Sequence, residues 1–428
     1  MTIALSERIK EKASFCAPAI RMLLRSRSGG SCITSFFCDK EIGKILQSKE
    51  TFSSAENCFS GYTIGKQKGA LFIPEEQNIE TQYEGILTAL KNRGKSGTHV
   101  PALIALQNTG IFSVAETKAG ADVIIRDFFC AWKSKKKAPP VRKKISGQKD
   151  AVKTGRVSGK IAVITGSAQG FGKGIAELLA QEGAYTVIAD INESAAKQFA
   201  SDLCRTYGKG KALAVGVDVT REDSIKNLML ETVLAYGGID LFISNAGILK
   251  AGALEEMDLA TFELVTKINY SAYYLGVKYA SRYMKIQHRF DKGYFNDIIQ
   301  INSKSGLEGS NKNFAYAGGK FGSIGLTQSF ALELVDYNIK VNSICPGNFF
   351  EGPLWSDPVR GLFAQYLRTN KVPGARTIED VKRFYESKVP MKRGCSVRDV
   401  ASAVFYLIEQ KYETGQAVPV TGGQIMLR

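Results

Sequence analysis

Residues 159–428 predict an α/β protein in which helices cover both faces of a parallel sheet. Short apolar segments suited to strands alternate here with longer segments whose apolar residues recur at helical spacing. The first apolar segment ends at a cluster of glycines, and a later one ends in Asn-Ala-Gly. Right-handed crossovers between parallel strands then produce a doubly wound fold.

The expected strands are short and rich in branched apolar residues. They are IAVIT (161–165), TVIAD (186–190), ALAVGVDV (212–219), LFISNAG (241–247), DIIQINS (297–303) and KVNSICPG (340–347). Helical stretches separate these strands, beginning with KGIAELLAQEG (173–183), which has the apolar periodicity of an amphipathic helix.

The first part of the chain predicts a smaller α/β unit. Residues 76–92 suit a helix, and residues 102–116 suit two strands joined at the turn Asn108-Thr109-Gly110. Residues 117–133 then continue as a helix. No pattern of catalytic residues occurs in this part of the sequence, and its role stays open between assembly and substrate handling.

A basic segment divides the two parts. Residues 133–160 hold eleven Lys or Arg against one Asp, so most of the net charge of +16 lies in one short piece. Two prolines and few apolar residues favour a solvated linker there, with a tether to a polyanion as the alternative. We therefore expect a small α/β domain at residues 1–132, a basic linker at 133–158 and the doubly wound domain at 159–428.

Composition argues against several classes of protein. Eight single cysteines without a CxxC pair favour reduced thiols in a cytoplasm. His99 and His288 are the only histidines, so we expect no metal centre. No apolar run is long enough to cross a bilayer. The arginines and serines near the N-terminus are similar to those of an organelle presequence, but Glu7 and Glu11 argue against that interpretation.

The segment TGSAQGFGKG, which follows the first strand, suits dinucleotide binding. Glycine permits a tight turn and a close approach of pyrophosphate to the backbone, and the next helix directs its N-terminal amides at that anion. The candidate cofactor-binding residues of this Rossmann-like loop are Gly166, Ser167, Gln169, Gly170, Phe171 and Gly172.

Asp190 closes the second expected strand, eighteen residues after Gly172. A carboxylate there can accept hydrogen bonds from both hydroxyls of the adenosine ribose and repels a 2′-phosphate. With no arginine beside it, NAD is favoured over NADP. Later strand ends add further candidates for cofactor binding, with Asp218 placed to meet the adenine edge: Asp218, Val219, Asn245, Ala246 and Gly247.

Three polar residues near position 310 predict an acid–base centre. Ser303 precedes Tyr316 by thirteen residues, and Lys320 follows Tyr316 by four, which is one helical turn. A neighbouring ammonium lowers the pKa of a phenol, so we expect Tyr316 to take the hydroxyl proton of an alcohol during hydride transfer. Ser303 can donate a hydrogen bond to the substrate oxygen, with Ser305 as a competing serine, and Asn269 can connect Lys320 to solvent through a water.

These motifs together resemble the classical short-chain dehydrogenase/reductase family. TG-x-x-x-G-x-G, Asn-Ala-Gly, the serine–tyrosine–lysine set and Pro346-Gly347 all occur within residues 159–428. The resemblance implies a Rossmann-like domain, the roles of Asn269, Ser303, Tyr316 and Lys320 given above, cofactor contacts from Tyr316, Lys320, Pro346 and Gly347, and usually a homotetramer.

Longer segments resemble one branch of that family, the sorbitol-6-phosphate 2-dehydrogenases. They include IIQINSKSG, PGNFFEGP and TGQAVPVTGGQIM. This resemblance implies oxidation of D-sorbitol 6-phosphate to D-fructose 6-phosphate with NAD. A sugar phosphate requires cations, and the preferred candidates are Lys304, Lys392 and Arg393.

The N-terminal part lies outside this resemblance and is faintly similar to the end of a class II aldolase-type domain. We expect a remnant without lyase activity, whose removal with residues 1–150 leaves the chemistry intact. Two alternatives to the leading function stay open. One is a dehydrogenase for another polyol or secondary alcohol, and the other is a polyanion-binding protein that uses the basic linker.

Overall fold

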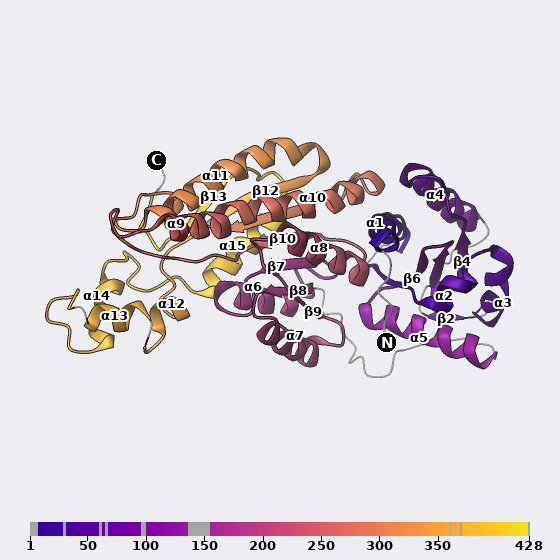
Figure 1. Cartoon of the computed structure of the whole chain (residues 1–428), viewed down its shortest axis with the longest axis horizontal. Coiled ribbons are helices and arrows are strands. Elements are labelled where there is room, and N and C mark those ends of the chain that lie inside the picture. The colour runs from indigo at the N-terminus through magenta and orange to yellow at the C-terminus, as the bar shows by residue number, and fades with distance from the viewer. Residues whose placement is uncertain are drawn as a thin grey trace.

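The computed structural model describes residues 7–28, 31–59, 62–64, 67–95, 100–135, 155–359, 361–368 and 370–426. The chain forms two main sheets, one in the N-terminal third and the other in the larger part that follows (Figure 1). His99 and residues 136–154 of the expected basic linker lie outside the described residues.

A seven-stranded sheet forms the centre of the larger part, with the order β13-β12-β11-β10-β7-β8-β9. All neighbouring strands are parallel. The strands are β7 (Ile161–Thr165), β8 (Tyr185–Asp190), β9 (Ala212–Gly216), β10 (Leu241–Ser244), β11 (Asn296–Ile301), β12 (Ile339–Pro346) and β13 (Ala417–Val420). The order reverses between β7 and β10, as in a doubly wound fold, which confirms the predicted fold class. The edge strand β13 is the one that our sequence analysis missed.

Helices cover both faces of this sheet because its strands are apolar on both sides. Ala162 and Ile164 of β7 face one core, which also contains α6 (Gly170–Gln181), α7 (Glu193–Tyr207) and α15 (Val397–Glu409). Ile161 and Val163 face the opposite core with α8 (Glu222–Tyr236), α10 (Ala272–Phe290) and α11 (Phe314–Leu334). Between β10 and α10 the chain forms α9 (Leu259–Thr266) and a π-helical turn, η1 (Lys267–Ser271).

Three short helices follow β12 and form a separate lobe at one end of the molecule (Figure 1). They are α12 (Pro353–Ser356), α13 (Leu362–Arg368) and α14 (Ile378–Ser387). Phe350, Trp355, Phe363 and Val381 give this lobe its own small aromatic core.

The N-terminal part contains a four-stranded mixed sheet with the order β1-β6-β5-β4. Its strands are β1 (Ile33–Phe37), β4 (Ala70–Ile73), β5 (Leu103–Leu106) and β6 (Gly110–Ala115), beside a small β2 (Thr63–Ile64) and β3 (Gln67–Lys68) hairpin. Its helices are α1 (Glu7–Ser28), α2 (Lys40–Ile45), α3 (Lys49–Phe59), α4 (Ile79–Lys95) and α5 (Lys118–Ser134). The turn between β5 and β6 is where we expected it, and Asn108 there has a φ of 53°.

The segment compared above with a presequence is the helix α1, which packs between the two parts of the molecule (Figure 1). One continuous hydrophobic core runs from the N-terminal sheet through α1 to α8 and α10. The boundaries that we assigned at residues 132 and 158 stay predictions. None of the described helices combines the length and apolarity needed to span a membrane.

Candidate active site

The glycine loop turns tightly between β7 and α6. Gly166 has a φ of 63° and Gly170 a φ of 61°, which favour glycine. A Cβ on Gly172 would come within 2.4 Å of the carbonyl oxygen of Gly166, and one on Gly166 would lie 2.8 Å from the Cα of Ala246. Around Gly170 no atom lies within 4 Å of such a Cβ, so the start of α6 is open to an anion. This cradle fits a dinucleotide pyrophosphate.

Hydrogen bonds join the glycine loop to the Asn-Ala-Gly segment after β10. The hydroxyl oxygen of Thr165 accepts from the backbone N–H groups of Asn245 and Ala246, at 3.1 and 3.2 Å. The side-chain amide of Asn245 donates to the carbonyls of Thr165 and Gly166, at 2.9 Å each. Ser167 is internal, since its hydroxyl donates to Ile164 and accepts from Ala189. These contacts lie at the topological switch point, where doubly wound folds bind cofactors.

Asp190 lies beside the glycine loop, as its spacing predicted. Its carboxylate accepts from the N–H of Ala168 at 2.9 Å and from the N–H of Asn192 at 3.0 Å. The next residue, Ile191, is 78% exposed. An exposed apolar side chain beside the carboxylate that we expect to bind the ribose suits the face of an adenine ring. Our sequence analysis missed it because one apolar residue carries no pattern.

Asp218 closes a turn after β9. Its carboxylate accepts from both the N–H and the hydroxyl of Thr220, and these hydrogen bonds hold its pKa below the usual range. A charged Asp218 can still present its other oxygen to the exocyclic amine of adenine. Gln169 is the N-cap residue of α6 but makes no capping hydrogen bond through its side chain.

The serine, tyrosine and lysine predicted as the acid–base centre come together from β11 and α11. Ser303 follows β11 and caps a short 3₁₀ helix, accepting from the N–H of Ser305 at 3.1 Å. Tyr316 and Lys320 lie one turn apart in α11, with the Lys320 Nζ 5.6 Å from the centroid of the tyrosine ring. Lys320 is 4% exposed and donates to the carbonyl of Ile301 at 3.0 Å.

Asn269 lies in the π-helical turn η1, a local distortion frequent at functional sites. Its side-chain amide donates to the carbonyls of Ile248 and Val265, at 2.8 and 3.0 Å. Its Oδ1 is buried without a hydrogen-bond partner among the described residues. A Cβ on Gly247 would come within 2.7 Å of this oxygen and 3.8 Å of the Lys320 Nζ. Glycine therefore leaves space between them, which suits the predicted water link.

Burial changes both pKa values in this pair. It raises the pKa of Tyr316, although a hydrogen bond with Ser303 acts in the opposite direction. Burial lowers the pKa of Lys320 to about 8. Our sequence analysis expected a lowered phenol pKa and considered the lysine charge alone. In the structure burial is the largest influence on both groups, and it disfavours the charged form of each.

An aromatic stack joins the glycine loop to the segment after β12. Phe171 and Phe349 lie 4.3 Å apart, with 16° between their ring planes. Phe349 comes two residues after Pro346-Gly347, and a Cβ on Gly347 would lie 2.8 Å from the Oε1 of Gln424. The chain continues from Phe349 directly into α12, the first helix of the lobe. No local sequence signal pairs these two rings, because they are far apart in the chain.

The three candidate phosphate ligands have different surroundings. Lys304 is partly buried directly after Ser303, and burial lowers its pKa. Lys392 is exposed and donates to the carbonyl of Ser387. The Arg393 guanidinium pairs with both oxygens of Asp399, at 2.6 and 2.9 Å, and so supports the capping box at the start of α15. The described residues contain no group of His, Cys, Asp or Glu that could hold a metal ion.

Comparison with known proteins gives consistent matches. Residues 160–353 match the short chain dehydrogenase family. The chain is 35% identical over 269 residues to sorbitol-6-phosphate 2-dehydrogenase of Escherichia coli, covering 62% of this chain and 99% of that protein. An uncharacterized oxidoreductase of Bacillus subtilis is 34% identical, with 62% and 97% covered. The crystal structure of sorbitol-6-phosphate 2-dehydrogenase from Erwinia amylovora superposes with a TM-score of 0.57 at 37% identity, covering 62% of this chain and all of that one.

The replacement Lys320→Met should stabilise the folded protein at pH 7, by about 3 kcal/mol. The folded pKa of about 8 lies below the ordinary 10.5, so the buried ammonium costs stability below pH 8. The wild type then gains stability as pH rises from 8 to 10.5, because the unfolded chain binds the additional proton in that range. The advantage of the variant should therefore shrink with pH. Thermal unfolding of both proteins between pH 7 and 10 measures it, and a lower melting temperature for Lys320→Met at pH 7 would contradict the assigned burial cost.

Proposed function

Because this chain belongs to the short-chain dehydrogenase family and is an oxidoreductase, we propose that it oxidises D-sorbitol 6-phosphate to D-fructose 6-phosphate with NAD. The observation that carries the proposal is the meeting of the glycine loop, Asn269, Ser303 and the Tyr316–Lys320 pair at one edge of the sheet. The similarity to two sorbitol-6-phosphate 2-dehydrogenases supports the choice of substrate.

In the proposed reaction this chain's own residues move the proton. The nicotinamide, when bound, supplies the acceptor for the hydride that leaves the carbinol carbon. Although burial raises the pKa of Tyr316, its phenolate form is the assigned base, and it takes the proton of the substrate hydroxyl as the C=O bond forms. The hydroxyl of Ser303 donates a hydrogen bond to the same substrate oxygen and stabilises its developing charge.

Lys320 and Asn269 are assigned to proton release. A lysine with a pKa of about 8 can exchange a proton near neutral pH, as a relay requires. Its Nζ and the unpartnered Oδ1 of Asn269 both border the space beside Gly247. A water there can accept a hydrogen bond from Lys320 and donate one to Asn269. The ammonium also favours the phenolate form of Tyr316 electrostatically.

The substrate test compares sorbitol 6-phosphate with free sorbitol, following NADH absorbance. Turnover of the phosphate ester with little turnover of the free polyol is expected. Tyr316→Phe should reduce kcat by at least about a thousandfold, since it removes the proton acceptor, while NADH binding stays unchanged. Full activity of Tyr316→Phe would contradict the assignment of Tyr316 as the base. Equal turnover of both substrates would favour the alternative of another polyol or secondary alcohol.

For the cofactor, the family uses NAD or NADP, and we infer NAD. The carboxylate of Asp190 is held beside the glycine loop by Ala168 and Asn192, where it would repel a 2′-phosphate. In Asp190→Asn the charge is lost and the shape is kept. The NADP-to-NAD ratio of kcat/KM should then rise roughly tenfold or more, as expected for loss of charge-assisted hydrogen bonds. A wild-type enzyme that prefers NADP would overturn this inference.

Among the candidate phosphate ligands, Lys304 has the strongest support. It lies next to Ser303, is partly buried and takes part in none of the salt bridges among the described residues, whereas Arg393 is paired with Asp399. Lys304→Gln should raise KM for sorbitol 6-phosphate roughly tenfold or more through loss of one charge-assisted contact. Affinity for NAD should not change. The matched control is Lys226→Gln on the exposed side of α8, and equal KM values for both variants would exclude Lys304 as the ligand.

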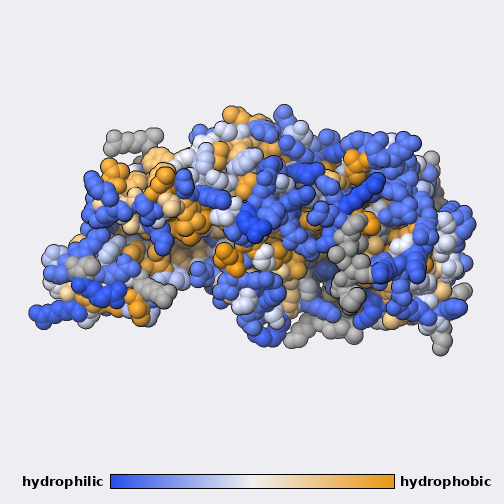
Figure 2. Space-filling model, viewed as in Figure 1, coloured by the Kyte–Doolittle hydropathy of each residue, from blue (hydrophilic) through white to orange (hydrophobic). Residues whose placement is uncertain are grey.

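We also propose that the enzyme is a cytoplasmic homo-oligomer, a tetramer or a dimer. Phe321 and Leu332 on α11 are large apolar side chains exposed to solvent, and Figure 2 shows further apolar residues over α9 and α11. Such a face suits contact with a second copy. The eight cysteines are free thiols, as a reducing compartment maintains. The polyanion-binding alternative depends on residues 136–154, which the structure does not describe.

A further inference from the structure

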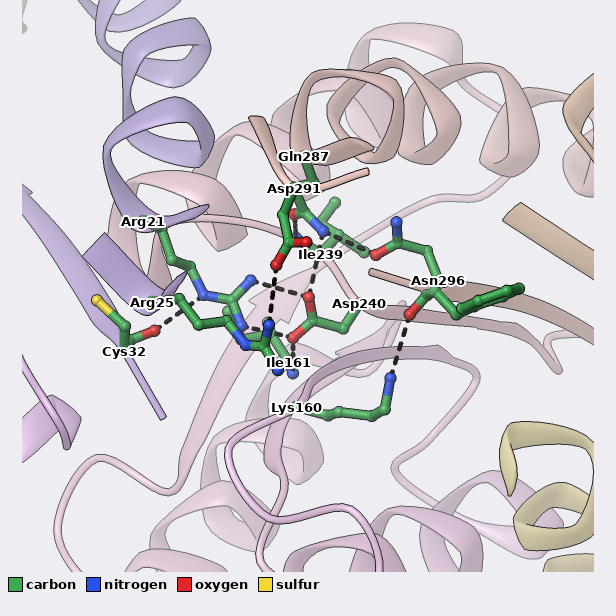
Figure 3. A network of polar contacts seen from close by, with 11 residues as sticks. Arg21, Arg25, Cys32, Lys160, Ile161, Ile239, Asp240, Gln287, Asp291 and Asn296 are labelled. Atoms are coloured by element: carbon green, nitrogen blue, oxygen red, sulfur yellow. Dashed lines mark hydrogen bonds and ion pairs between the residues drawn. The ribbon is translucent and has the colours of Figure 1, made fainter. Parts of the chain in front are cut away.

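A buried ion pair connects α1 to the base of the central sheet. The guanidinium of Arg21 donates to both carboxylate oxygens of Asp240, at 2.8 and 2.7 Å (Figure 3). The side chain of Arg21 is 1% exposed and that of Asp240 is fully buried. The two residues are 219 positions apart in the sequence.

Further hydrogen bonds make this pair a junction between several elements. Asp240 also accepts from the N–H of Ile161, the first residue of β7, at 2.8 Å and from the amide of Gln287 in α10 at 3.2 Å. The Nε of Arg21 donates to the carbonyl of Cys32 at 2.9 Å, just before β1. The junction therefore holds α1, β1, β7, β10 and α10 at one point (Figure 3).

The charge of Asp240 depends on Arg21. A fully buried carboxylate without a counter-ion costs several kcal/mol. The groups that face Asp240 are Arg21 from α1, Lys160 before β7, and Tyr294 and Asp297 around the start of β11. Lys160 donates to the carbonyl of Phe295, and Lys340 pairs with Asp297. Arg21 is the cation in this group that binds both oxygens of Asp240.

Glycines on the larger part allow the N-terminal part to approach closely. A Cβ on Gly237 would lie 2.8 Å from the Cβ of Thr34, and one on Gly238 would lie 2.9 Å from Arg21. Gly159 and Gly210 face Ser31 and Lys118 in the same way, at 2.4 and 2.7 Å. Gly159, Gly210 and Gly237 also have positive φ values. At each of these four glycines a larger side chain would collide with the N-terminal part. The surface of the larger part therefore fits the N-terminal part of this chain.

Apolar contacts complete the interface. Ala13, Cys16, Ala17, Ile20 and Leu24 of α1 are fully buried in the core that also contains α8 and α10. The hydroxyl of Tyr283 in α10 donates to the hydroxyl oxygen of Ser14, at 3.2 Å, and Tyr83 packs edge-on against Phe290. An α1 exposed by separation of the two parts would present a large apolar face to water.

We propose that residues 7–135 are a permanent structural part of the dehydrogenase, which supplies Arg21 as the counter-ion of Asp240 and covers α8 and α10. The described residues of that part contain no group of His, Cys, Asp or Glu that could hold a metal ion. The junction lies at the start of β7 and β10, whose other ends carry the glycine loop and Asn245. The proposal differs from our sequence-based expectation that residues 1–150 can be removed without effect on the chemistry, which stays an untested prediction.

The chain offers one tryptophan reporter on each side of the interface, Trp132 in α5 and Trp355 in α12. Full-length Trp132→Phe and Trp355→Phe each keep one reporter. Under the proposal, urea unfolding of the two proteins, followed by fluorescence, gives transitions with coincident midpoints. Two separate transitions would overturn the proposal. In that case the Trp132 signal changes first, while the Trp355 signal and NADH binding stay unchanged. No substrate is needed, so failure here is distinct from failure of the proposed function.

A charge test uses Arg21→Met in both single-tryptophan backgrounds. It should lower both melting temperatures together by several degrees or more, because Asp240 is left buried and unpaired. The matched control is Arg289→Met, which removes an exposed ion pair with Glu80 across the same interface and should shift them little. Adding Asp240→Asn to Arg21→Met should recover part of the loss. A lower melting temperature in the Trp132 signal alone would overturn the proposal. If Arg21→Met does not fold, the comparison of urea midpoints and the recovery of folding in the double variant decide.

Discussion

The carboxylate of Asp240 is the constraint around which the two parts of the molecule are arranged. It is fully buried at the start of β10, so its negative charge is tolerated only because Arg21 and several hydrogen bonds surround it. Burial alone raises the pKa of a carboxyl, but Arg21, the charge of Lys160 and the N–H of Ile161 together outweigh burial and hold the pKa of Asp240 below its usual range. The N-terminal part, the central sheet and α10 meet at this one charge.

The same strands that begin at this junction end at the candidate active site. β7 and β10 are short, and the loops that follow them are joined through Thr165 and Asn245. The candidate active site lowers the stability of the fold. Lys320 is a buried cation with a lowered pKa, which a fold optimised for stability alone would replace with an apolar side chain. Its retention beside Tyr316 is consistent with a role in proton transfer.

The candidate active site and the N-terminal part lie at opposite ends of the central sheet (Figure 1). The lobe of α12–α14 and the Phe171–Phe349 stack lie where the strands end, and the N-terminal part lies at the opposite end of the sheet (Figure 1). The relatives that align over nearly their full length cover 62% of this chain. The family match spans residues 160–353, so α1 and Arg21 lie outside the part that matches the short chain dehydrogenase family.

The sequence by itself determined the features that depend on local pattern. Apolar periodicity located β7, β8 and α5 to within a few residues, and glycine spacing located the turn between β7 and α6, because strands and turns follow from neighbouring residues. The one-turn separation of Tyr316 and Lys320 likewise follows from helix geometry. Tertiary structure alone decided the Arg21–Asp240 pair, the Phe171–Phe349 stack and the raised pKa of Tyr316. These depend on which distant residues are buried together, and burial sets the strength of a charge interaction.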